Sequence, residues 1–257
     1  MPELPDLQAF SYNLNKKLAD KTVKAVTANT KKLNVSEKEL NETLAHQNVK
    51  KVYRDGKQLF IEFNKGDILS LHLMLHGKLF LFEGKNEHKY SILDILFTDD
   101  SGFTLTDYQK AATPTLNPEP TTAPDALAKE VTAEFFNELL AKKKTNIKTV
   151  LLDQHIIKGI GNAYADEILW HARISPFSTG NKIPADKIKV LVKAIHTTLE
   201  EAEKEILKSN PDIINGEVRD FMLIHNSKKE KSPNGADIKI KEGTRKTYYT
   251  DEQELYK

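Results

Sequence analysis

Apolar side chains recur with two different periods along this chain, and each period predicts a different kind of element. In the first twenty residues they stand three or four positions apart, at Leu7, Phe10, Leu14 and Leu18, which is the spacing of one face of an amphipathic helix. Pro5 lies where its fixed φ suits the first turn of such a helix. We therefore predict that a helix anchors the N-terminus of the chain.

From residue 22 to residue 106 the pattern changes to short runs rich in β-branched and aromatic residues. Turn signals separate the runs, such as Asn-Lys-Gly-Asp at 64–67 and Asp-Asp-Ser-Gly at 99–102. Several antiparallel strands at this spacing predict a β-sandwich or a barrel. The predicted strands are VKKVY, QLFIEF, ILSLHL, KLFLF, SILDILF and GFTLT.

A change of composition divides the chain near its middle. Residues 109–126 contain four prolines among many threonines and alanines, which is typical of an extended linker. After the linker a helical spacing returns, and the polar tail beyond residue 226 includes a run that predicts a small hairpin at 238–250. The predicted helices span residues 131–142, 147–152, 163–172 and 185–209.

We therefore expect an α+β fold of two domains. A chain of 257 residues is long enough for two ordinary domains, and we find no internal repeat or low-complexity tract in it. We place a β-sandwich domain at residues 1–115, a linker at 116–126, a helical domain at 127–224 and a terminal hairpin at 225–257.

The composition restricts the chemistry of the chain more than it identifies a partner. There is no cysteine, which excludes a disulfide framework, a thiolate zinc site and a cysteine nucleophile. No run approaches the ~18 consecutive apolar residues of a membrane span, and the N-terminus lacks the features of a signal peptide. We therefore expect a cytoplasmic protein that does not enter a membrane.

Charge is balanced over the whole chain but not along it. The net charge is +1, from 38 Lys and Arg against 37 Asp and Glu, so bulk electrostatics does not indicate a polyanionic partner. Residues 142–148 nevertheless hold four lysines and no acid, and residues 226–246 hold seven basic residues against three acids. Because charge runs are usually solvated faces, both need support from geometry before they indicate nucleic acid.

The segment at residues 151–176 has the most specific local pattern. Gly159 and Gly161 allow a tight turn and a close approach of the backbone to a ligand, and we predict that Asn162 caps the helix that follows. A helix N-terminus with free N–H groups is well suited to holding a phosphate. An ordinary helix–turn–helix connection with a cap is the alternative interpretation of the same residues.

Together these motifs resemble the Fpg/Nei family of DNA glycosylases, formamidopyrimidine-DNA glycosylase and endonuclease VIII. MPELPDL resembles the N-terminal signature of that family, and 151–176 its helix–two-turn–helix segment. RDGKQLF at 54–60 and HLMLHGKL at 72–79 are similar to its lysine-containing strand and its hairpin loop, and NPEP and KKKTNIK follow in the family's order. The resemblance runs the length of the chain.

The resemblance implies the organisation and the partner of the protein. The first domain would be catalytic, the second a helix–two-turn–helix domain, and the terminal hairpin a finger. The partner would be double-stranded DNA that contains a damaged base or an abasic site, bound by a monomer that needs no cofactor. The resemblance further implies a bacterial-type protein that is cytoplasmic and associated with the nucleoid.

The resemblance also implies catalytic roles for Pro2, Glu3 and Lys57. Once Met1 is removed, the Pro2 nitrogen would attack C1′ of the damaged nucleotide, expel the base and form an iminium that eases β- and then δ-elimination. An α-amino group has a pKa of ~8, so more of it is unprotonated near neutral pH than of a lysine at ~10.4. Glu3 would move protons, and Lys57 would hold the phosphate next to the lesion.

A structural interpretation of the same residues stays open. Pro2 and Glu3 are also suited to starting a helix and stabilising its dipole, and a lysine in a strand usually faces solvent. The two interpretations of the N-terminal pair differ in one observable, because a retained Met1 would leave the Pro2 nitrogen as a non-nucleophilic amide.

Further residues match DNA contacts of the family. His72, Asn162 and Arg245 would hold phosphates, although a histidine in ILSLHL also suits a half-buried position and Arg245 a plain turn. Met74 and Leu75 match an intercalating loop that fills the gap left by an extruded base, and apolar side chains are common wedges. An apolar pair in a hairpin is equally compatible with the core.

The C-terminal tail departs from the family, whose typical members carry a zinc finger with four cysteines. Here the ligand positions fall near Lys231, Asn234, Thr250 and Gln253, none of which supplies a thiolate. We therefore predict a zincless finger, with no metal, that depends on packing. The residues predicted to pack are Ile238, Ile240, Tyr248 and Tyr249.

The region that contacts the partner base in the Fpg branch also differs. The family has an Arg and a Phe after the Asp of an inter-strand loop, but this loop reads DYQKAATP. Ala111 stands at the Phe position, with Gln109 or Lys110 near that of the Arg. Oxidised purines, oxidised pyrimidines and abasic sites therefore all stay open as substrates. Asp6 replaces the usual Glu, which keeps the charge and shortens the reach.

The main hypothesis is a base-excision repair glycosylase with abasic-site lyase activity. Two alternatives belong to other classes of protein. The first is a non-catalytic binder of damaged or structured nucleic acid that retains the fold. The second is a ribosome- or RNA-associated helix–two-turn–helix protein, which would leave the N-terminal Pro-Glu pair without a purpose.

Overall fold

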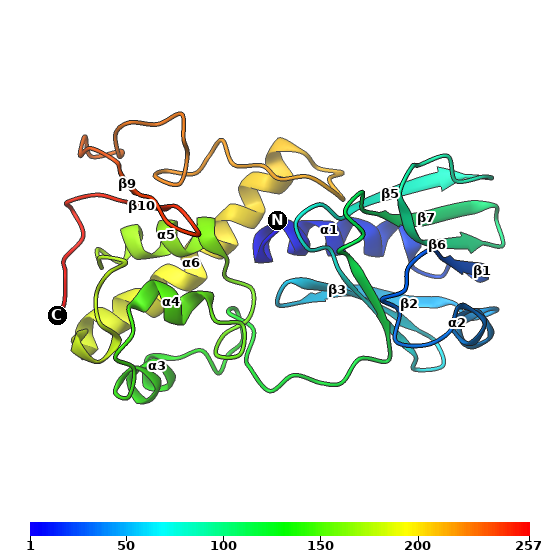
Figure 1. Cartoon of the computed structure of the whole chain (residues 1–257), viewed down its shortest axis with the longest axis horizontal. Helices are drawn as coiled ribbons and strands as arrows, with labels where there is room; N and C mark the ends of the chain where they lie inside the picture. The colour runs from blue at the N-terminus through cyan, green and yellow to red at the C-terminus, as the bar shows by residue number, and fades with distance from the viewer. The chain divides into compact units, whose positions relative to one another are not determined.

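The structure is a computed structural model that describes residues 1–257. The chain divides into two compact units (Figure 1). The first comprises Met1–Thr121 and Ile206–Glu217, and the second comprises Thr122–Glu205 and Val218–Lys257. None of the helices is both long and apolar enough to cross a membrane.

The first unit begins with helix α1, Leu4–Leu18. Glu3 is its N-cap residue, and a proline follows within the first two positions, where a missing N–H has no cost. The apolar face predicted from the sequence is buried, with Leu7, Phe10 and Leu14 at most 1% exposed. Because α1 packs against strands β2 and β3, the N-terminus is anchored as predicted.

Two antiparallel four-stranded sheets form the rest of the first unit, which confirms the predicted sandwich. Each run predicted to be a strand is one. The first sheet has the order β1-β6-β7-β5, with bounds Val23–Ala28, Ser91–Phe97, Ser101–Thr106 and Lys78–Glu83. The second has the order β2-β3-β4-β8, with bounds Val49–Asp55, Gln58–Phe63, Ile68–His72 and Thr113–Leu116.

Three elements of this unit differ from the sequence prediction. Strand β1 was not among the predicted runs. Helix α2, Glu37–Leu44, was not expected because only Leu40 and Leu44 are apolar and buried in it; Ser36 caps it by accepting a hydrogen bond from Glu39 N–H. Strand β8 lies inside the proline-rich stretch predicted to be a linker from residue 109. Pro114 is tolerated there because β8 is an edge strand, paired only with β4.

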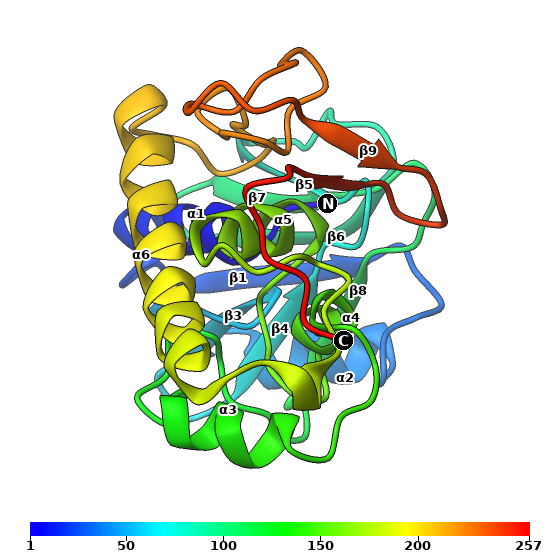
Figure 2. The same ribbon diagram turned by 90° about the vertical axis from the view of Figure 1, so that its left-hand side faces the viewer.

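The second unit is mainly helical, as predicted. It contains α3 (Ala133–Leu140), α4 (Ile147–Leu152), α5 (Asn162–His171) and α6 (Ala185–Ser209), whose last turn belongs to the first unit. A short 3₁₀ turn, Gly180–Lys182, precedes α6. The predicted terminal hairpin is present as β9 (Lys239–Lys241; labelled in Figure 2) and β10 (Thr247–Tyr249), with β10 beside α5 (Figure 1).

The terminal hairpin packs through a small apolar cluster. Trp170 of α5, Ile224 and Tyr248 are buried together, and Leu223 and Ile238 pack against them. Tyr249 adds an edge-to-face contact with Phe177 at 5.0 Å between ring centroids. The prediction was wrong for Ile240, which is 46% exposed although it pairs with the buried Tyr248, because β10 and not β9 is the strand of the ribbon that packs against α5.

Candidate active site

The N-terminal pair lies at the capped start of α1. Pro2 is buried and Glu3 is 5% exposed. The Asp6 carboxylate, which is fully buried, accepts a hydrogen bond from Glu3 N–H at 2.8 Å, as in a capping box. Asp6 thus reaches the backbone of the N-cap residue, although its side chain is shorter than that of the usual Glu. Capping fixes Glu3 beside Pro2, so the structural role and the proposed chemical role are compatible.

Met1 precedes this buried pair and is itself partly exposed. Its ammonium group lies 2.5 Å from the Glu217 carboxylate, and the side chains of the two residues are 31% and 35% exposed. With Met1 in place the Pro2 nitrogen belongs to an amide.

Lys57 lies in the two-residue loop between β2 and β3, directly before the strand rather than at its first position. Asp55 pairs with Gln58, and Gly56 takes φ 57° at the first central position of the turn, where a side chain would be strained. Arg54 braces the loop, because its guanidinium donates to the Gly56 carbonyl at 3.3 Å and to Gln8 of α1 at 2.9 Å. The lysine is thus carried by a turn that is tied to α1.

His72 ends strand β4 opposite Gln58, which places it beside Lys57. Burial lowers the pKa of His72, and the charge of Lys57 lowers it further, so the ring is neutral at pH 7. Its Nδ1 accepts a hydrogen bond from Met74 N–H at 3.2 Å. The proton of the neutral ring therefore sits on Nε2, which makes this atom a hydrogen-bond donor. Lys57 and His72 form one cluster of donors.

The loop between β4 and β5 exposes the two apolar residues predicted to intercalate. Leu73 is 2% exposed, whereas Met74 is 37% and Leu75 62% exposed. Gly77 N–H donates to the Leu73 carbonyl at 2.9 Å and closes the loop, and a Cβ on Gly77 would stand 2.3 Å from that oxygen. The core interpretation of this pair is therefore excluded, since Leu73 is the residue that enters the core.

In the second unit Asn162 is the first residue of α5 and not its cap. The N-cap is Gly161, in extended conformation, so the capping prediction was wrong: the chain turns one residue earlier than the asparagine. The Asn162 side chain instead donates from Nδ2 to the Lys246 carbonyl at 3.0 Å. Its Oδ1 atom is buried and has no hydrogen-bond partner. Asn162 thereby lies next to the turn that carries Arg245.

Gln154 shapes the turn before α5, and the sequence interpretation missed it. Its amide donates to the carbonyls of Leu152 and Ile160, and its oxygen accepts from Gly159 N–H at 2.9 Å. Gly159 has φ 103°, the left-handed conformation expected of a glycine in a tight turn. Its position, as a polar residue between two apolar helices, is the feature of the sequence from which this role could have been predicted.

Asp166 joins α4, α5 and the terminal hairpin. This fully buried carboxylate lies 2.7 Å from Lys148 Nζ and 2.8 Å from His225 Nδ1, and it accepts Tyr248 N–H at 2.9 Å. Lys148 also donates to Thr247 Oγ1 at 3.0 Å. Lys148 was expected in a basic surface patch, but it is a buried structural cation, because the hairpin backbone and Asp166 satisfy its ammonium group.

Glu167, the next residue of α5, also binds a segment from outside the helix. Its carboxylate accepts the backbone N–H groups of three consecutive residues at 2.6–2.9 Å: Leu223, Ile224 and His225. Two adjacent acids within an otherwise apolar helix, ADEILW, were the signal that could have predicted this clamp. Together the two carboxylates attach the segment before the hairpin, and the hairpin itself, to α5.

The four positions that would carry zinc ligands take part in polar interactions instead. Asn234 Nδ2 and Thr250 Oγ1 donate to the Glu252 carboxylate at 2.6 and 3.1 Å. Gln253 accepts Thr250 N–H at 2.8 Å, and Lys231 pairs with Asp237 at 2.5 Å. No group of three or more His, Cys, Asp and Glu side chains is arranged to hold a metal ion.

Glu252 is the centre of this network. It also accepts Trp170 Nε1–H at 3.0 Å and pairs with Arg173 at 2.7 Å. Burial acts to raise the pKa of Glu252, but hydrogen bonds from Asn234, Ser232 and other neighbours outweigh it and lower the pKa to about 2. The hairpin is thus joined to α5 by an ionised carboxylate.

The predicted site residues fall into two groups, one in each unit. In the first unit lie Pro2 and Glu3, the Lys57 and His72 donors, and the Met74 and Leu75 loop. In the second unit Asn162 lies beside the Arg245 turn, and Arg245 itself is exposed. Each unit therefore carries both a cationic and a neutral hydrogen-bond donor.

Comparison with known proteins decides the family. Residues 1–113 match the formamidopyrimidine-DNA glycosylase N-terminal domain, and residues 122–209 match the formamidopyrimidine-DNA glycosylase H2TH domain. The chain belongs to the formamidopyrimidine-DNA glycosylase (Fpg/Nei) family. The H2TH match contains the Gly-x-Gly turn and Asn162, and the N-terminal match contains Pro2, Glu3, Lys57 and the exposed loop.

Individual members of the family resemble the chain over most or all of its length. The formamidopyrimidine-DNA glycosylase of Lactobacillus johnsonii is 32% identical over 288 residues, covering 100% of both chains. That of Lactobacillus gasseri is 34% identical over 226 residues, covering 80% of this chain and 78% of the relative. The solved Fpg of Lactococcus lactis, in complex with DNA that contains an oxidised pyrimidine, has a TM-score of 0.85 at 25% identity, covering 98% of this chain and 100% of that one.

Proposed function

We propose that this member of the Fpg family is a base-excision repair DNA glycosylase with abasic-site lyase activity. The observation that carries the proposal is the buried Pro2–Glu3 pair at the capped start of α1, in a chain whose relatives are named DNA glycosylases. The Lactococcus lactis relative was solved with damaged DNA, which supports duplex DNA with a damaged base or an abasic site as the partner.

The reaction starts when removal of Met1 frees the Pro2 nitrogen as a secondary amine. That nitrogen forms a bond to C1′ of the damaged nucleotide while the bond from C1′ to the base breaks, and the departing base takes up the proton that the Pro2 nitrogen loses. Glu3 gives a proton to the ring oxygen as the sugar opens, which leaves a cationic iminium between Pro2 and C1′. A general base then removes the C2′ proton, and the electrons of that C–H bond expel the 3′ phosphate in a β-elimination. A second elimination expels the 5′ phosphate.

The donors of the first unit hold the phosphate next to the lesion. Lys57 supplies a positive charge, and the neutral His72 supplies its Nε2–H, so the cluster binds a phosphate through one cationic and one neutral donor. In the second unit Asn162 and Arg245 bind further phosphates of the same backbone. Affinity therefore falls steeply as salt rises, because each phosphate contact releases counterions.

The exposed loop supports the stack when a nucleotide leaves it. Extruding a base for chemistry opens a gap in the duplex, and apolar side chains are the usual wedges at such gaps. Leu75, at 62% exposure the more prominent of the two apolar residues, enters the gap, and Met74 covers its edge. Leu73 in the core and the closed turn at Gly77 keep the wedge rigid.

Borohydride trapping tests the proposal. Duplexes that carry one defined lesion each, an abasic site, an oxidised purine or an oxidised pyrimidine, are incubated with enzyme whose N-terminus has been verified by mass spectrometry. We expect a covalent complex with at least one duplex, and we expect Pro2→Gly and Glu3→Gln to suppress turnover. Pro5→Ala is the matched control, since it changes the other proline of the same segment without touching the nucleophile.

A non-catalytic binder of damaged or structured nucleic acid is the second candidate. The hairpin without cysteines and the Ala111 that stands in place of the Phe motivate it, and a retained Met1 would block the Pro2 nitrogen. Mass spectrometry of the purified N-terminus separates the two functions. Met1 removed and no trapped complex with any lesion would exclude the catalytic proposal, whereas a retained Met1 together with tight binding would favour the binder.

A further inference from the structure

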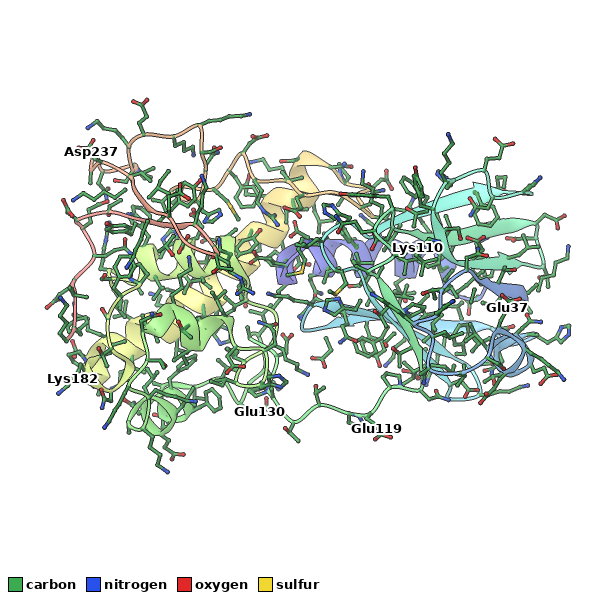
Figure 3. All side chains as sticks on the ribbon, in the orientation of Figure 1. Glu37, Lys110, Glu119, Glu130, Lys182 and Asp237 are labelled. Atoms are coloured by element: carbon green, nitrogen blue, oxygen red, sulfur yellow. The ribbon has the colours of Figure 1, made fainter.

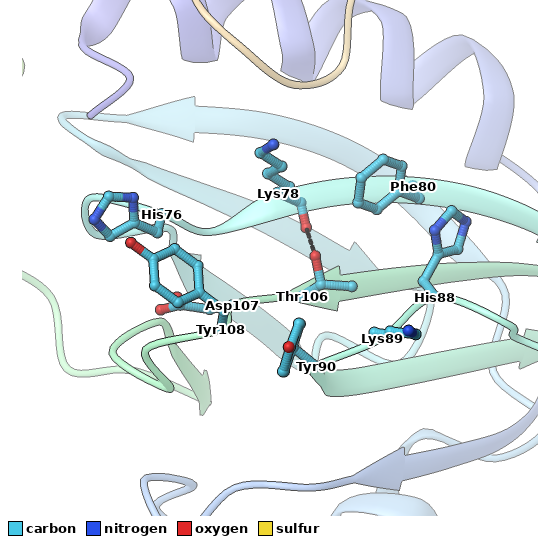
Figure 4. A pocket seen from close by; sticks show the side chains of 9 residues that line it. All are labelled: His76, Lys78, Phe80, His88, Lys89, Tyr90, Thr106, Asp107 and Tyr108. Atoms are coloured by element: carbon cyan, nitrogen blue, oxygen red, sulfur yellow. Dashed lines mark hydrogen bonds between the residues drawn. The ribbon is translucent and has the colours of Figure 1, made fainter.

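A segment that is distant from α1 in the sequence packs against it in the first unit (Figure 3). This return segment, residues 206–217, comprises the last turn of α6 and the residues that follow it. Asn13 of α1 donates from its buried side chain to the Ile213 carbonyl at 2.9 Å. Asn215 donates at 2.9 Å to the Leu79 carbonyl of β5, the strand whose first residue is labelled in Figure 4. Both α1 and the first sheet therefore fix the path of the return segment.

Glu217, the last residue of the return segment, contacts the N-terminal nitrogen of the chain. Its Oε1 atom lies 2.5 Å from the Met1 nitrogen. Because successive backbone nitrogens are separated by at most about one residue length, ~3.5 Å, this oxygen lies within roughly 6 Å of the Pro2 nitrogen. The Glu217 side chain is long and 35% exposed, so it is free to turn toward the Pro2 nitrogen once Met1 is removed. The mature N-terminus therefore has a carboxylate within reach.

The other charged groups near this end of α1 already have a task in the fold or in the proposed reaction. Asp6 is fully buried and accepts Glu3 N–H at 2.8 Å in the cap, and Glu3 is the proton donor to the sugar. From the turn between β2 and β3, Arg54 donates to α1 and to the turn itself, and Lys57 holds a phosphate. Glu217 comes from a different element and brings a negative charge that the cap does not require.

A carboxylate at this place matters because positive charge develops on the nitrogen during the reaction. The Pro2 nitrogen attacks as a neutral amine and becomes part of a cationic iminium. A fixed negative charge close to the nitrogen stabilises that cation more than it stabilises the neutral amine. An interaction that is stronger in the transition state than in the ground state accelerates the chemical step. Glu217 is therefore placed to speed the chemistry without binding the DNA itself.

We propose that Glu217 is the counter-ion of the Pro2 nitrogen. It accepts a hydrogen bond from the amine that removal of Met1 exposes, and it then stabilises the positive charge of the iminium. The proposal rests on the proposed function, because the cation forms only if Pro2 is the nucleophile. Glu217 takes up no proton and forms no bond to the substrate, so the proton transfers remain those of Glu3 and the departing base. The return segment thus adds a second carboxylate to the active site.

Single-turnover borohydride trapping on a duplex with one abasic site tests the proposal. There the same iminium forms from the sugar aldehyde with loss of water. With Met1 verified as removed, we expect Glu217→Gln to slow formation of the trapped complex roughly tenfold, less than the loss of a fully enclosed donor. Glu217→Asp keeps the charge and should recover most of the rate. Asp212→Asn is the matched control, because Asp212 is an acid of the same segment whose 84% exposed side chain pairs with Lys17.

Affinity and stability distinguish a counter-ion from a structural residue. Because a single exposed charge contributes little, we expect E217Q to bind a duplex with a tetrahydrofuran abasic analogue within about twofold of the wild type, at an unchanged unfolding midpoint. Equal trapping rates in wild type and E217Q overturn the proposal, and so does a parallel loss of rate, affinity and midpoint. A wild type that traps no duplex removes the proposed function as well, whereas one that traps at the E217Q rate retains the function and loses only the counter-ion.

Discussion

Lys57 and His72 in the first unit owe their positions to the register of a sheet, whereas in the second unit buried charges hold the hairpin of Arg245 beside Asn162 of α5. The pairing of Gln58 with His72, and a glycine turn braced by Arg54, place the first pair. Asp166, Glu167 and Glu252 attach the hairpin of the second pair to α5. The second pair is consequently the more sensitive to the loss of a single side chain.

The reason lies in the number of interactions that hold each element. A strand inside a sandwich is positioned by many backbone hydrogen bonds and apolar contacts, so no single polar group decides its place. The two-stranded hairpin has three-residue strands and a small apolar cluster, and such a ribbon is marginally stable alone. Carboxylates attach this element to α5.

Replacing Asp166 by Ala has the largest expected effect. It leaves the buried Lys148 ammonium without its counter-ion, and breaking a buried pair in this way costs about 3–5 kcal/mol of unfolding free energy. We expect a much lower urea midpoint and weaker binding of damaged duplex, because the Arg245 turn loses its attachment. Glu200→Ala, an exposed acid of α6, is the control. A D166A midpoint equal to that of the control would refute the attachment.

Replacing Glu252 by Gln is expected to have the next largest effect. The folded pKa of about 2 lies below the ordinary value of 4.5, so the ionised carboxylate stabilises the fold above pH 4.5, and this contribution is lost as the pH falls toward 2. Unfolding midpoints measured from pH 7 to pH 2.5 should therefore drop more steeply in the wild type than in E252Q. Parallel curves would show that Glu252 does not stabilise the hairpin.

Of the three replacements, that of His72 is expected to change stability least, and its effect on DNA binding depends on the side chain that is introduced. The lowered pKa of His72 means that the unfolded chain binds its proton more readily, so stability rises with pH between the folded pKa and ~6.5, and His72→Gln removes this slope. His72→Gln keeps an N–H donor and should bind duplex DNA more tightly than His72→Ala, by a few-fold. Equal affinities of the two variants would show that His72 donates no hydrogen bond to the DNA.

Several elements of the fold could be predicted from local pattern alone. The α1 face, the six strand runs and the bounds of α4 and α6 follow from periodicity, since each buries a contiguous apolar face. Helix α2 could not be predicted, because it has only two buried apolar residues. Strand β8 was not predicted because it contains Pro114. The cap at Gly161 also escaped prediction, because the backbone conformation before α5 depends on the bonds of Gln154.

The sequence by itself determined the order of the motifs, the absence of thiolate ligands and the residue types available for chemistry at Pro2, Glu3, Lys57 and Asn162. Only the tertiary structure decided which polar residues are structural. Asp166 and Glu252 are ordinary acids in the sequence, and they become anchors because residues 59–82 positions away deliver buried donors to them. The rings of Tyr108 and His76 likewise contact each other only because two loops meet in the fold. Such pairings depend on contacts between segments far apart in the chain, which periodicity and composition do not encode.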